Sequence, residues 1–499
     1  MDGKTPGSVF RPAFMLVSGR TLGFVVSFAI PVVLVRIFSQ TEFGTYKQLF
    51  LIYTTLYGIG QLGMAESLYY FLPSAPADRG GYVTNAVLVL ALSGLACLGL
   101  LWINEKAVGR GFKNPQLVTY LPLIGTYLLL MLVTAVFEIV MITRKRHLFA
   151  FGAYALSDLV RSVLYLLPAL LFRSLGALFL GALAFAAVRF GAVALYLRRE
   201  FSEGLRFDAT LMKKHLAYAL PFALAVSIET LQNNLHMYVV SYHFDAATFA
   251  IYSVGCLQIP LVEFMMTSTS SVMMVKMGED LRDNRNEEAL DLWLDTTRKL
   301  TLLFAPLVGV LVVTANKLIV LLFTSNYAAS APLFMLWSLS MLFAAIMTDS
   351  VLRVHADTRF LVVLNLLRLA VVALAIVPLL SRFGLVGAVS VTLLATAVAK
   401  CAALARVTAI LRCGFSHVLP WRNLLSILAI AAGAGLPCLL LESALQLPTL
   451  PGLLILGTLY ALSYGLLLWF CGPLSAGERR TILQWLQVTG TWAGGNRRA

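Results

Sequence analysis

The chain contains 499 residues, of which 59% are hydrophobic and 12% are charged, and its formal net charge is +14. Soluble domains are near half apolar and about a quarter charged, so this composition excludes an ordinary soluble fold. The excess of positive charge suits either a nucleic acid or a membrane surface, and its distribution along the chain separates the two.

Apolar runs of span length follow one another along the whole chain, separated by short polar breaks. A helix needs about 20 residues to cross a bilayer core of roughly 30 Å. The sequence therefore predicts an all-α polytopic membrane protein with about fourteen transmembrane helices, arranged as two pseudo-symmetric six-helix lobes plus two C-terminal helices. The predicted spans are 13–37, 43–72, 82–103, 116–142, 148–172, 176–197, 215–241, 246–275, 300–323, 331–352, 360–380, 385–411, 423–442 and 452–471.

The basic residues outside these spans fall mainly on one side of the membrane. If the N-terminus is cytoplasmic, 25 lysines and arginines lie on the cytoplasmic side and 7 on the other. This asymmetry is the positive-inside pattern, and it predicts a multi-pass protein with both termini in the cytoplasm. Topology accounts for the charge, so we expect no nucleic-acid partner.

Short matches at a near-constant offset indicate an internal repeat. The segments FSQTEFGTY and FDAATFAIY, which begin at Phe38 and Phe244, are 206 positions apart, and DLVR at Asp158 matches NLLR at Asn365 at an offset of 207. Six spans per repeat give both halves the same orientation, and transporters built this way bind substrate between the halves near the midplane. The predicted parts are an N-lobe at 1–197, a cytoplasmic linker at 198–214, a C-lobe at 215–411, and the last two spans with a cytoplasmic tail at 412–499.

Charged side chains lie within the predicted spans. A charge at the bilayer centre costs at least about 2.5 kcal/mol, so such residues normally face a protein interior or a wet cavity. Ion pairs that brace neighbouring helices are the simpler interpretation, and we favour it for Lys47, Glu66, Glu138 and Asp349, which lie near span ends. The others are Arg20, Asp158, Arg161, Arg189, Glu229, Glu263, Arg368 and Lys400.

One span carries a polar stripe. Glu229, Gln232, Asn233 and His236 follow the i, i+3, i+4, i+7 spacing that places side chains on one helical face. We predict that this stripe lines a cavity, and a buried hydrogen-bonded seam is the alternative. A weaker stripe, formed by Thr392, Thr396 and Lys400, is equally compatible with hydrogen bonds between helices.

The arginines within the spans differ in their local partners. Asp158 precedes Arg161 by three residues, close enough on a helix to pair, whereas the matching position of Arg368 carries Asn365 instead of an acid. Arg368, together with Arg20 and Arg189, is therefore a candidate source of unneutralised positive charge in a cavity. A guanidinium group stays charged and binds phosphate bidentately, so the pattern favours an anionic, phosphate-bearing substrate.

The sequence has none of the motifs that we associate with catalysis. It lacks a P-loop, an HExxH, a GxSxG and any Cys/His cluster with metal-ligand spacing, and we interpret the six cysteines as packing residues. The predicted outer loops are too short for the large loop expected of a glycan polymerase or ligase. We therefore predict a transporter, with no enzyme activity, no cofactor and no metal site.

Two segments resemble a known family. Residues 16–73, from LVSGRTLGF to YYFLP, are similar to the start of bacterial polysaccharide flippases, the Wzx-like branch of the multidrug/oligosaccharidyl-lipid/polysaccharide (MOP) superfamily. The second likeness runs from RNEEALDLWLDTTRKL at Arg285 into ANKLIVLLFTSNYAASAPLFMLW at Ala315. The likeness covers most of the first twelve spans and rests on FGTY-type junctions and hydropathy.

The resemblance implies a fold, a function and roles for particular residues. It implies two six-helix lobes around a basic cavity, and alternating-access export of undecaprenyl-diphosphate-linked oligosaccharide across the bacterial inner membrane, driven by an ion or by the membrane potential. A polysaccharide polymerase and a chain-length regulator are the implied partners. The residues that best match the family's cavity cations are Arg20 and Arg368. Together with the polar residues found within the spans, the predicted substrate-binding residues are Arg20, Arg368, Arg189, Lys400, Gln232 and Asn233, and the predicted ion-coupling acids are Glu229, Glu263 and Asp158.

Two other functions stay open. A drug or cation antiporter of the same superfamily is the first alternative, although such antiporters favour acidic cavities and this chain carries cations deep in its spans. A membrane glycosyltransferase or ligase is the alternative of another class, and it requires catalytic acids in a sizeable loop.

Overall fold

The computed structural model describes residues 28–144, 147–201, 205–445, 447–474 and 477–480. Throughout these ranges the regular structure is helical, with two short 3-10 turns and no strand. Nine of the described helices are long and apolar enough to cross a membrane, and shorter apolar helices accompany them. The predicted fold class, an all-α polytopic membrane protein, is confirmed.

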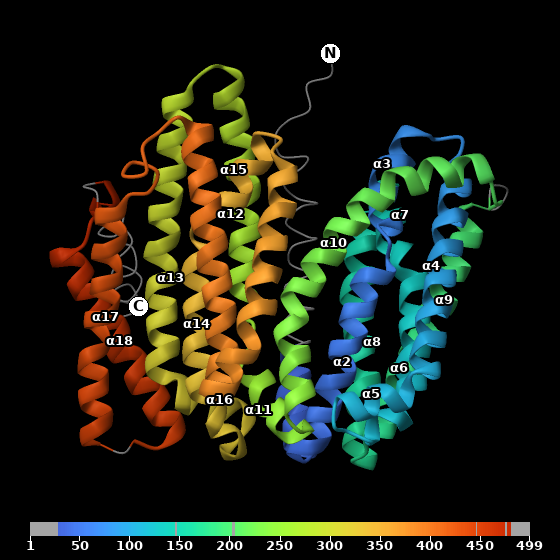
Figure 1. Ribbon diagram of the computed structural model, residues 1–499, viewed down its shortest axis with the longest axis horizontal. Helices are drawn as coiled ribbons and strands as arrows, with labels where there is room; N and C mark the ends of the chain where they lie inside the picture. The colour runs from blue at the N-terminus through green and yellow to red at the C-terminus, as the bar shows by residue number, and fades with distance from the viewer. Residues whose placement is uncertain (1–27, 145–146, 202–204, 446, 475–476, 481–499) are drawn as a thin grey trace, which may run out of the picture. The chain divides into compact units, whose positions relative to one another are not determined.

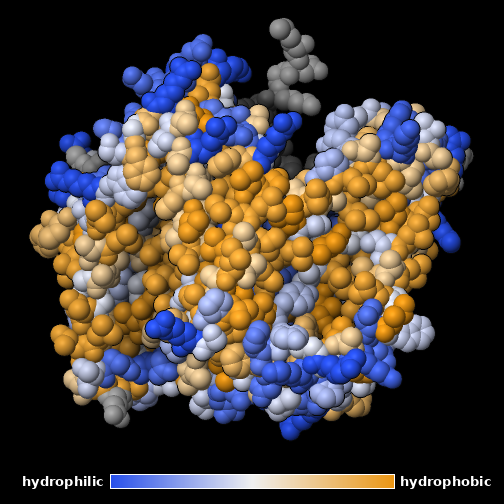
Figure 2. All heavy atoms as spheres, viewed as in Figure 1, coloured by the Kyte–Doolittle hydropathy of each residue, from blue (hydrophilic) through white to orange (hydrophobic). Residues whose placement is uncertain are grey.

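The helices form two compact units, which are described separately. Unit 1 comprises residues 1–256 and 365–392, and unit 2 comprises residues 257–364 and 393–499. On each unit, the face drawn in Figure 2 is apolar over the middle of the helices and hydrophilic near their ends. Large side chains such as Leu440, Leu462 and Phe470 are more than 60% exposed. Apolar exposure on this scale is expected where lipid covers the surface.

Unit 1 is built mainly from the first part of the chain (Figure 1). A short apolar helix at Phe28–Ile37 leads into it. Its further helices are α2 (Gln40–Gly60), α3 (Met64–Ser74), α4 (Arg79–Ile103), α5 (Glu105–Gly111), α6 (Gln116–Val133), η1 (Thr134–Val136), α7 (Phe137–Thr143), α8 (His147–Phe172), α9 (Leu175–Glu200), α10 (Ala209–His243) and α11 (Ala246–Gly255).

Two helices of unit 1 begin with similar caps at positions 206 residues apart. Ser39 Oγ accepts a hydrogen bond from the Glu42 backbone N–H at 3.3 Å, and the Glu42 carboxylate accepts one from the Ser39 N–H at 2.9 Å. Asp245 accepts one from the Thr248 N–H at 2.9 Å, and its hydrogen bonds with Thr248 lower the pKa of the Asp245 carboxyl. Each N-cap contributes about 1 kcal/mol, so both helices start at defined residues.

Close packing between α2 and α11 leaves no room for a side chain at Gly44. A Cβ added there would lie 1.8 Å from the carbonyl oxygen of Ala246. We expect Gly44→Ala to destabilise the fold by about 1–3 kcal/mol, because the backbone must shift to accept the methyl group. The matched control is Gly191→Ala, since no atom lies within 4 Å of that added Cβ. Thermal unfolding in detergent measures both, and equal unfolding temperatures would contradict the contact.

The predicted continuous span 43–72 is broken in the structure. It divides into α2 and α3 at a turn in which Leu62 and Gly63 have φ values of 48° and 66°. Glycine adopts positive φ without steric cost, which explains why the turn forms here. The carbonyl oxygen of Gly60 accepts a hydrogen bond from Ser93 Oγ at 2.8 Å, so this end of α2 gains a partner from α4.

Three other predicted spans are also interrupted. The span 331–352 breaks between α14 (Ala331–Ala344) and α15 (Thr348–Val354). The span 116–142 passes through the 3-10 turn η1 between α6 and α7. The span 246–275 stops at the end of α11 and resumes at Pro260, a residue that suits the first turn of a helix because it lacks an N–H. Irregular backbone at membrane depth is tolerated where it is buried in protein or lines a cavity.

Unit 2 is organised around one long helix, α13, which packs against α12, α14, α17 and α18. Tyr460 of α18 packs against Gly309 of α13 and donates a hydrogen bond to the Ala431 carbonyl of α17 at 2.9 Å. The elements are α12 (Pro260–Arg282), α13 (Asn286–Phe323), η2 (Ser325–Ser330), α14 (Ala331–Ala344), α15 (Thr348–Val354), α16 (Thr358–Leu411), α17 (Trp421–Ala444) and α18 (Thr449–Cys471).

The helix α16 combines two predicted spans, 360–380 and 385–411. Gly384 separates them with φ 58° and ψ −142°, values that lie outside the helical region. The middle of α16, residues 365–392, belongs to unit 1, and its two ends belong to unit 2. The predicted lobe boundaries, at the linker 198–214 and at residue 411, derive from the sequence repeat. The compact units are defined by packing and do not test these boundaries, which stay a prediction.

Candidate functional site

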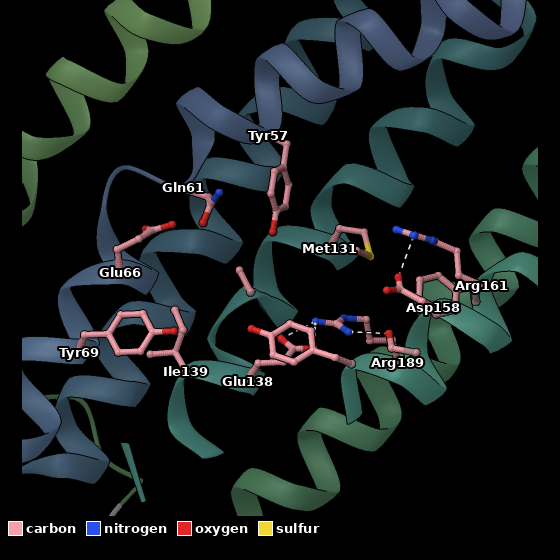
Figure 3. Close-up of a pocket in the computed structure, with 14 residues that line it drawn as sticks. Tyr57, Gln61, Glu66, Tyr69, Met131, Glu138, Ile139, Asp158, Arg161 and Arg189 are labelled. Carbon is pink, nitrogen blue, oxygen red and sulfur yellow. Dashed lines mark hydrogen bonds and ion pairs between the residues drawn. The ribbon is translucent and has the colours of Figure 1, made fainter. Parts of the chain in front are cut away.

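Unit 1 contains a polar pocket of about 450 Å³ between α2, α3, α6–α7, α8 and α9 (Figure 3). Both interruptions of the unit 1 spans reach it, since Gln61 lies in the α2–α3 turn and Ala135 lies in η1. Its lining residues are Tyr57, Gln61, Glu66, Tyr69, Met131, Ala135, Glu138, Ile139, Tyr154, Ser157, Asp158, Arg161, Phe185 and Arg189. Discontinuous helices commonly form the solute sites of transporters, so a polar pocket at two such breaks is a candidate site.

An ion pair joins α7 and α9 in the pocket wall. Arg189 Nη2 lies 2.8 Å from the Glu138 carboxylate, and both side chains are largely buried. The same guanidinium group donates to Thr134 Oγ1 at 3.1 Å and to Ser157 Oγ at 2.8 Å. Arg189 therefore connects four elements, η1, α7, α8 and α9. All of its nitrogen atoms have protein partners, so it holds the pocket wall together.

A second ion pair lies along α8. Arg161 Nη2 is 2.7 Å from Asp158 Oδ1, at the i, i+3 spacing. The predicted pairing of these two residues is confirmed. Figure 3 shows this pair on the opposite side of the pocket from Gln61 and Glu66.

Three polar groups on α2, the turn and α3 offer hydrogen-bonding capacity to the pocket. Glu66 Oε2 is buried and has no hydrogen-bond partner among the residues that the structure describes. Within the same ranges, the Gln61 amide and the Tyr57 hydroxyl have no side-chain hydrogen bond either. In Figure 3 the Tyr57 hydroxyl points into the pocket, and Gln61 and Glu66 lie next to it. These groups are available to a bound molecule.

The charges that line the pocket do not balance. Three carboxylates, of Glu66, Glu138 and Asp158, face two guanidinium groups, of Arg161 and Arg189, so the formal charge is −1. Coulomb repulsion in a protein interior is several times stronger than in water. The pocket therefore suits a neutral polar group or a cation better than a phosphate.

The α10 stripe predicted from spacing lies partly on the surface of unit 1. Glu229 and Asn233 are exposed, whereas Gln232 is half-buried and its Oε1 has no hydrogen-bond partner in the described part of the chain. His236 is buried and shares a 2.7 Å hydrogen bond with the Tyr252 hydroxyl of α11. The stripe is therefore buried in a contact between α10 and α11 at His236, and its side chains are exposed at Glu229 and Asn233. Its role in lining a cavity stays a prediction.

The predicted residue Lys400 braces unit 2. Its ammonium group donates to the Ile346 carbonyl oxygen at 2.8 Å and to Thr348 Oγ1 at 3.1 Å, and it lies 3.5 Å from Asp349 Oδ1. These bonds tie α16 to the interruption between α14 and α15. The sequence leaves hydrogen bonding between helices open as the role of this stripe, and the observed contacts of Lys400 are of that kind. Its role in substrate binding stays a prediction.

Of the three remaining predicted residues, the structure describes Arg368 and Glu263. Arg368 is half-buried on α16, forms no ion pair with the residues described, and has a buried Nε without a hydrogen-bond partner among them. Arg20 lies outside the described residues. Glu263 is exposed in the first turn of α12. A phosphate clamp formed by Arg20 and Arg368 therefore stays a prediction.

Sequence reasoning missed several residues of the pocket. The sequence pattern does not point to Tyr57, Gln61 or Tyr154, and it assigns Glu66 only a structural role near a span end. The bracing role predicted for Glu138 agrees with its ion pair with Arg189. The segment GQLGM, which contains the α2–α3 turn, carries the one usable signal, because two glycines interrupt an apolar run.

The chain is similar to proteins of known family and fold. The model of a family described as "Polysaccharide biosynthesis protein" matches residues 33–332. The lipid II flippase MurJ, in an inward closed conformation, is 13% identical with a TM-score of 0.70, and the match covers 89% of this chain and 97% of that one. The sequences of curated proteins give no match.

Two further solved structures extend the likeness. A MOP superfamily transporter from Pyrococcus furiosus is 13% identical with a TM-score of 0.58, over 83% of this chain and all of that one. The Vibrio cholerae MATE transporter VcmN, in the bent form, is 14% identical with a TM-score of 0.53, over 81% of this chain and 98% of that one. At these identities the likeness shows the fold, which is that of the MOP superfamily.

Proposed function

The chain belongs to the polysaccharide biosynthesis protein family, and from this premise we propose that it is a flippase for lipid-linked oligosaccharide. Its substrate is undecaprenyl-diphosphate-linked oligosaccharide, a polysaccharide repeat unit. The protein moves this unit from the cytoplasmic to the periplasmic leaflet of the bacterial inner membrane by alternating access. Both termini lie in the cytoplasm, as the charge asymmetry predicts.

The polar pocket of unit 1 is the observation that best supports transport. Two spans are interrupted where they reach it, and charged residues line it within helices long enough to cross a membrane. Such residues are expensive in lipid, and they mark the path of a polar solute through the membrane. A scaffold or receptor does not require a pocket of this kind.

Arg368 is the residue that we assign to the substrate diphosphate. Its guanidinium group carries a positive charge within a span, and no carboxylate of the described chain neutralises it. A charge-assisted contact with phosphate contributes about 1.5–3 kcal/mol. We assign Arg20 to the same role from its sequence position, and Gln232 and Asn233 to polar contacts along α10.

Asp158 is our first candidate for ion coupling. Its carboxylate lines the pocket and pairs with Arg161, so a proton that binds Asp158 would weaken this pair and change the charge of the pocket. Glu229 and Glu263 are the other two candidates for ion coupling, and both side chains are exposed. A transported ion must alter the energy of one conformation relative to another, and the breaking of an ion pair has that effect.

One observation favours a second function, an antiporter for drugs or organic cations. The pocket has a formal charge of −1 and contains three tyrosines, Tyr57, Tyr69 and Tyr154. Carboxylates and tyrosine rings both attract cations. The pocket of unit 1 is the observation that favours the antiporter, whereas the family match favours the flippase.

Reconstituted flipping tests the proposal. Purified protein in liposomes that contain fluorescent undecaprenyl-diphosphate oligosaccharide should accelerate transfer of the glycan between leaflets, as measured by its accessibility to an impermeant lectin. Liposomes without the protein supply the control. Transfer at the protein-free rate, together with accelerated efflux of an organic cation such as ethidium, would favour the antiporter and contradict the flippase.

A further inference from the structure

The hydrogen-bonding groups that Tyr57, Gln61 and Glu66 offer to the unit 1 pocket suggest that different residues of the protein bind different parts of the substrate. We propose that this pocket is a saccharide-binding subsite, which holds a sugar ring of the substrate while the diphosphate binds elsewhere. The inference rests on the proposed function and extends it, because it assigns one chemical part of the substrate to one group of residues.

Charge separates the two parts of the substrate. The carboxylates of the pocket outnumber its guanidinium groups by one, and every nitrogen atom of the Arg189 guanidinium group already donates to a protein acceptor. A diphosphate carries at least two negative charges and would be repelled from such a pocket. A sugar ring is neutral and rich in hydroxyl groups, so it meets no such repulsion.

The available groups match the hydrogen-bonding pattern of a sugar. Each sugar hydroxyl is both a donor and an acceptor. The Gln61 amide offers two donors and an acceptor, the Tyr57 hydroxyl offers both functions, and the Glu66 carboxylate is a strong acceptor. These three groups lie together on one side of the pocket (Figure 3), so neighbouring hydroxyls of one ring can reach them together.

Aromatic rings and size support the same occupant. Tyr57, Tyr69 and Tyr154 line the pocket, and tyrosine presents an apolar ring face beside a polar hydroxyl. The C–H face of a sugar ring packs on such a surface while its hydroxyls bond to the polar groups around it. The volume of about 450 Å³ lies within the range of roughly 300–1,000 Å³ that is usual for small-molecule pockets.

The α2–α3 turn positions these groups. Leu62 and Gly63 both have positive φ, and a Cβ on Gly63 would lie 2.8 Å from the Ala219 carbonyl oxygen of α10. A positive φ at a residue other than glycine costs about 1–3 kcal/mol and persists where the surrounding structure maintains it, often at ligand sites. The turn redirects the chain so that Gln61 faces the pocket between Tyr57 and Glu66.

Binding of two lipids distinguishes the sugar from the diphosphate. The probes are undecaprenyl-diphosphate oligosaccharide and undecaprenyl diphosphate without sugar, and the measurement is the dissociation constant with purified protein in detergent. Tyr57→Phe and Gln61→Met should each weaken binding of the glycan-bearing lipid about three- to tenfold and leave undecaprenyl diphosphate unaffected. Tyr120→Phe is the matched control, because Tyr120 lies on α6 and does not line the pocket. Unchanged binding of undecaprenyl diphosphate also shows that each variant is folded.

Two substitutions at Glu66 distinguish a sugar from a cation. Glu66→Gln keeps a hydrogen-bonding side chain, so a sugar subsite should lose less affinity with this variant than with Glu66→Ala. Equal losses of ethidium affinity with the two variants, with binding of the glycan-bearing lipid unchanged in both, would identify a charge-dependent cation site and overturn the inference.

The remaining outcomes separate the inference from the function on which it rests. If the wild-type protein binds both lipids and the pocket variants weaken both equally or neither, the subsite is overturned and the flippase proposal stands. If the wild-type protein binds neither lipid, the proposed function fails together with the subsite.

Discussion

Arg189→Met is expected to destabilise the protein by about 3–5 kcal/mol, because it leaves the Glu138 carboxylate buried without its ionic partner. The substitution also removes the donors to Thr134 and Ser157, so η1, α7 and α8 lose the polar contacts that this side chain makes with them from α9. Thermal unfolding in detergent measures the effect. The double variant Glu138→Met, Arg189→Met should recover much of the loss, since apolar groups of similar size leave no unpaired charge.

The control for this prediction lies on the same helix. Arg198 is exposed in the last turn of α9, and Arg198→Met should change stability by less than about 1 kcal/mol. If Arg189→Met were as stable as Arg198→Met and export were lost, Arg189 would be a substrate ligand and not a brace. The comparison therefore decides between the contacts observed for Arg189 and the binding role predicted for it.

Arg368→Ala is expected to reduce export tenfold or more while leaving protein abundance unchanged. The Arg368 guanidinium group forms no ion pair within the described ranges, so its removal breaks no salt bridge there, whereas a lost charge-assisted phosphate contact costs about 1.5–3 kcal/mol. Surface glycan in a flippase-null bacterium that expresses each variant measures export. Arg368→Lys should retain part of the activity, because it keeps the charge and loses the bidentate geometry.

Arg382 supplies the matched control for Arg368. It lies on the same helix, is exposed, and has its guanidinium group near the Phe383 ring, so Arg382→Ala should export normally. Normal export by Arg368→Ala at wild-type abundance would refute the phosphate assignment. Loss of protein in that variant, with export per molecule preserved, would show that Arg368 serves folding instead.

The membrane architecture follows from the sequence with little help from tertiary contacts. Span length and apolar composition predict helices because lipid satisfies no backbone hydrogen bond, and a helix satisfies its own. The Asp158–Arg161 pair was predictable for a related reason, since residues three apart on a helix are neighbours whatever the helix packs against. Both features depend on local spacing alone.

The interruptions of the spans were harder to predict. Residues 43–72 have the composition of one long helix, and the turn at Leu62 and Gly63 is stabilised by packing against α10 and by the Ser93 hydrogen bond to Gly60. Composition predicts how many residues form helix. It does not predict the position at which packing against a neighbouring helix makes a turn more stable than continued helix.

Composition and local spacing are sufficient to predict the all-α membrane fold, the local ion pair of α8 and the presence of charges within the spans. Which charges on different helices meet depends on tertiary packing. Glu138 and Arg189 are 51 residues apart and come together because α7 and α9 turn these two faces toward one pocket. Lys400 reaches a carbonyl group exposed by the break after α14. Local spacing places neighbours along one helix, whereas the partners of a side chain on another helix depend on how each helix is rotated and packed, which no single segment encodes.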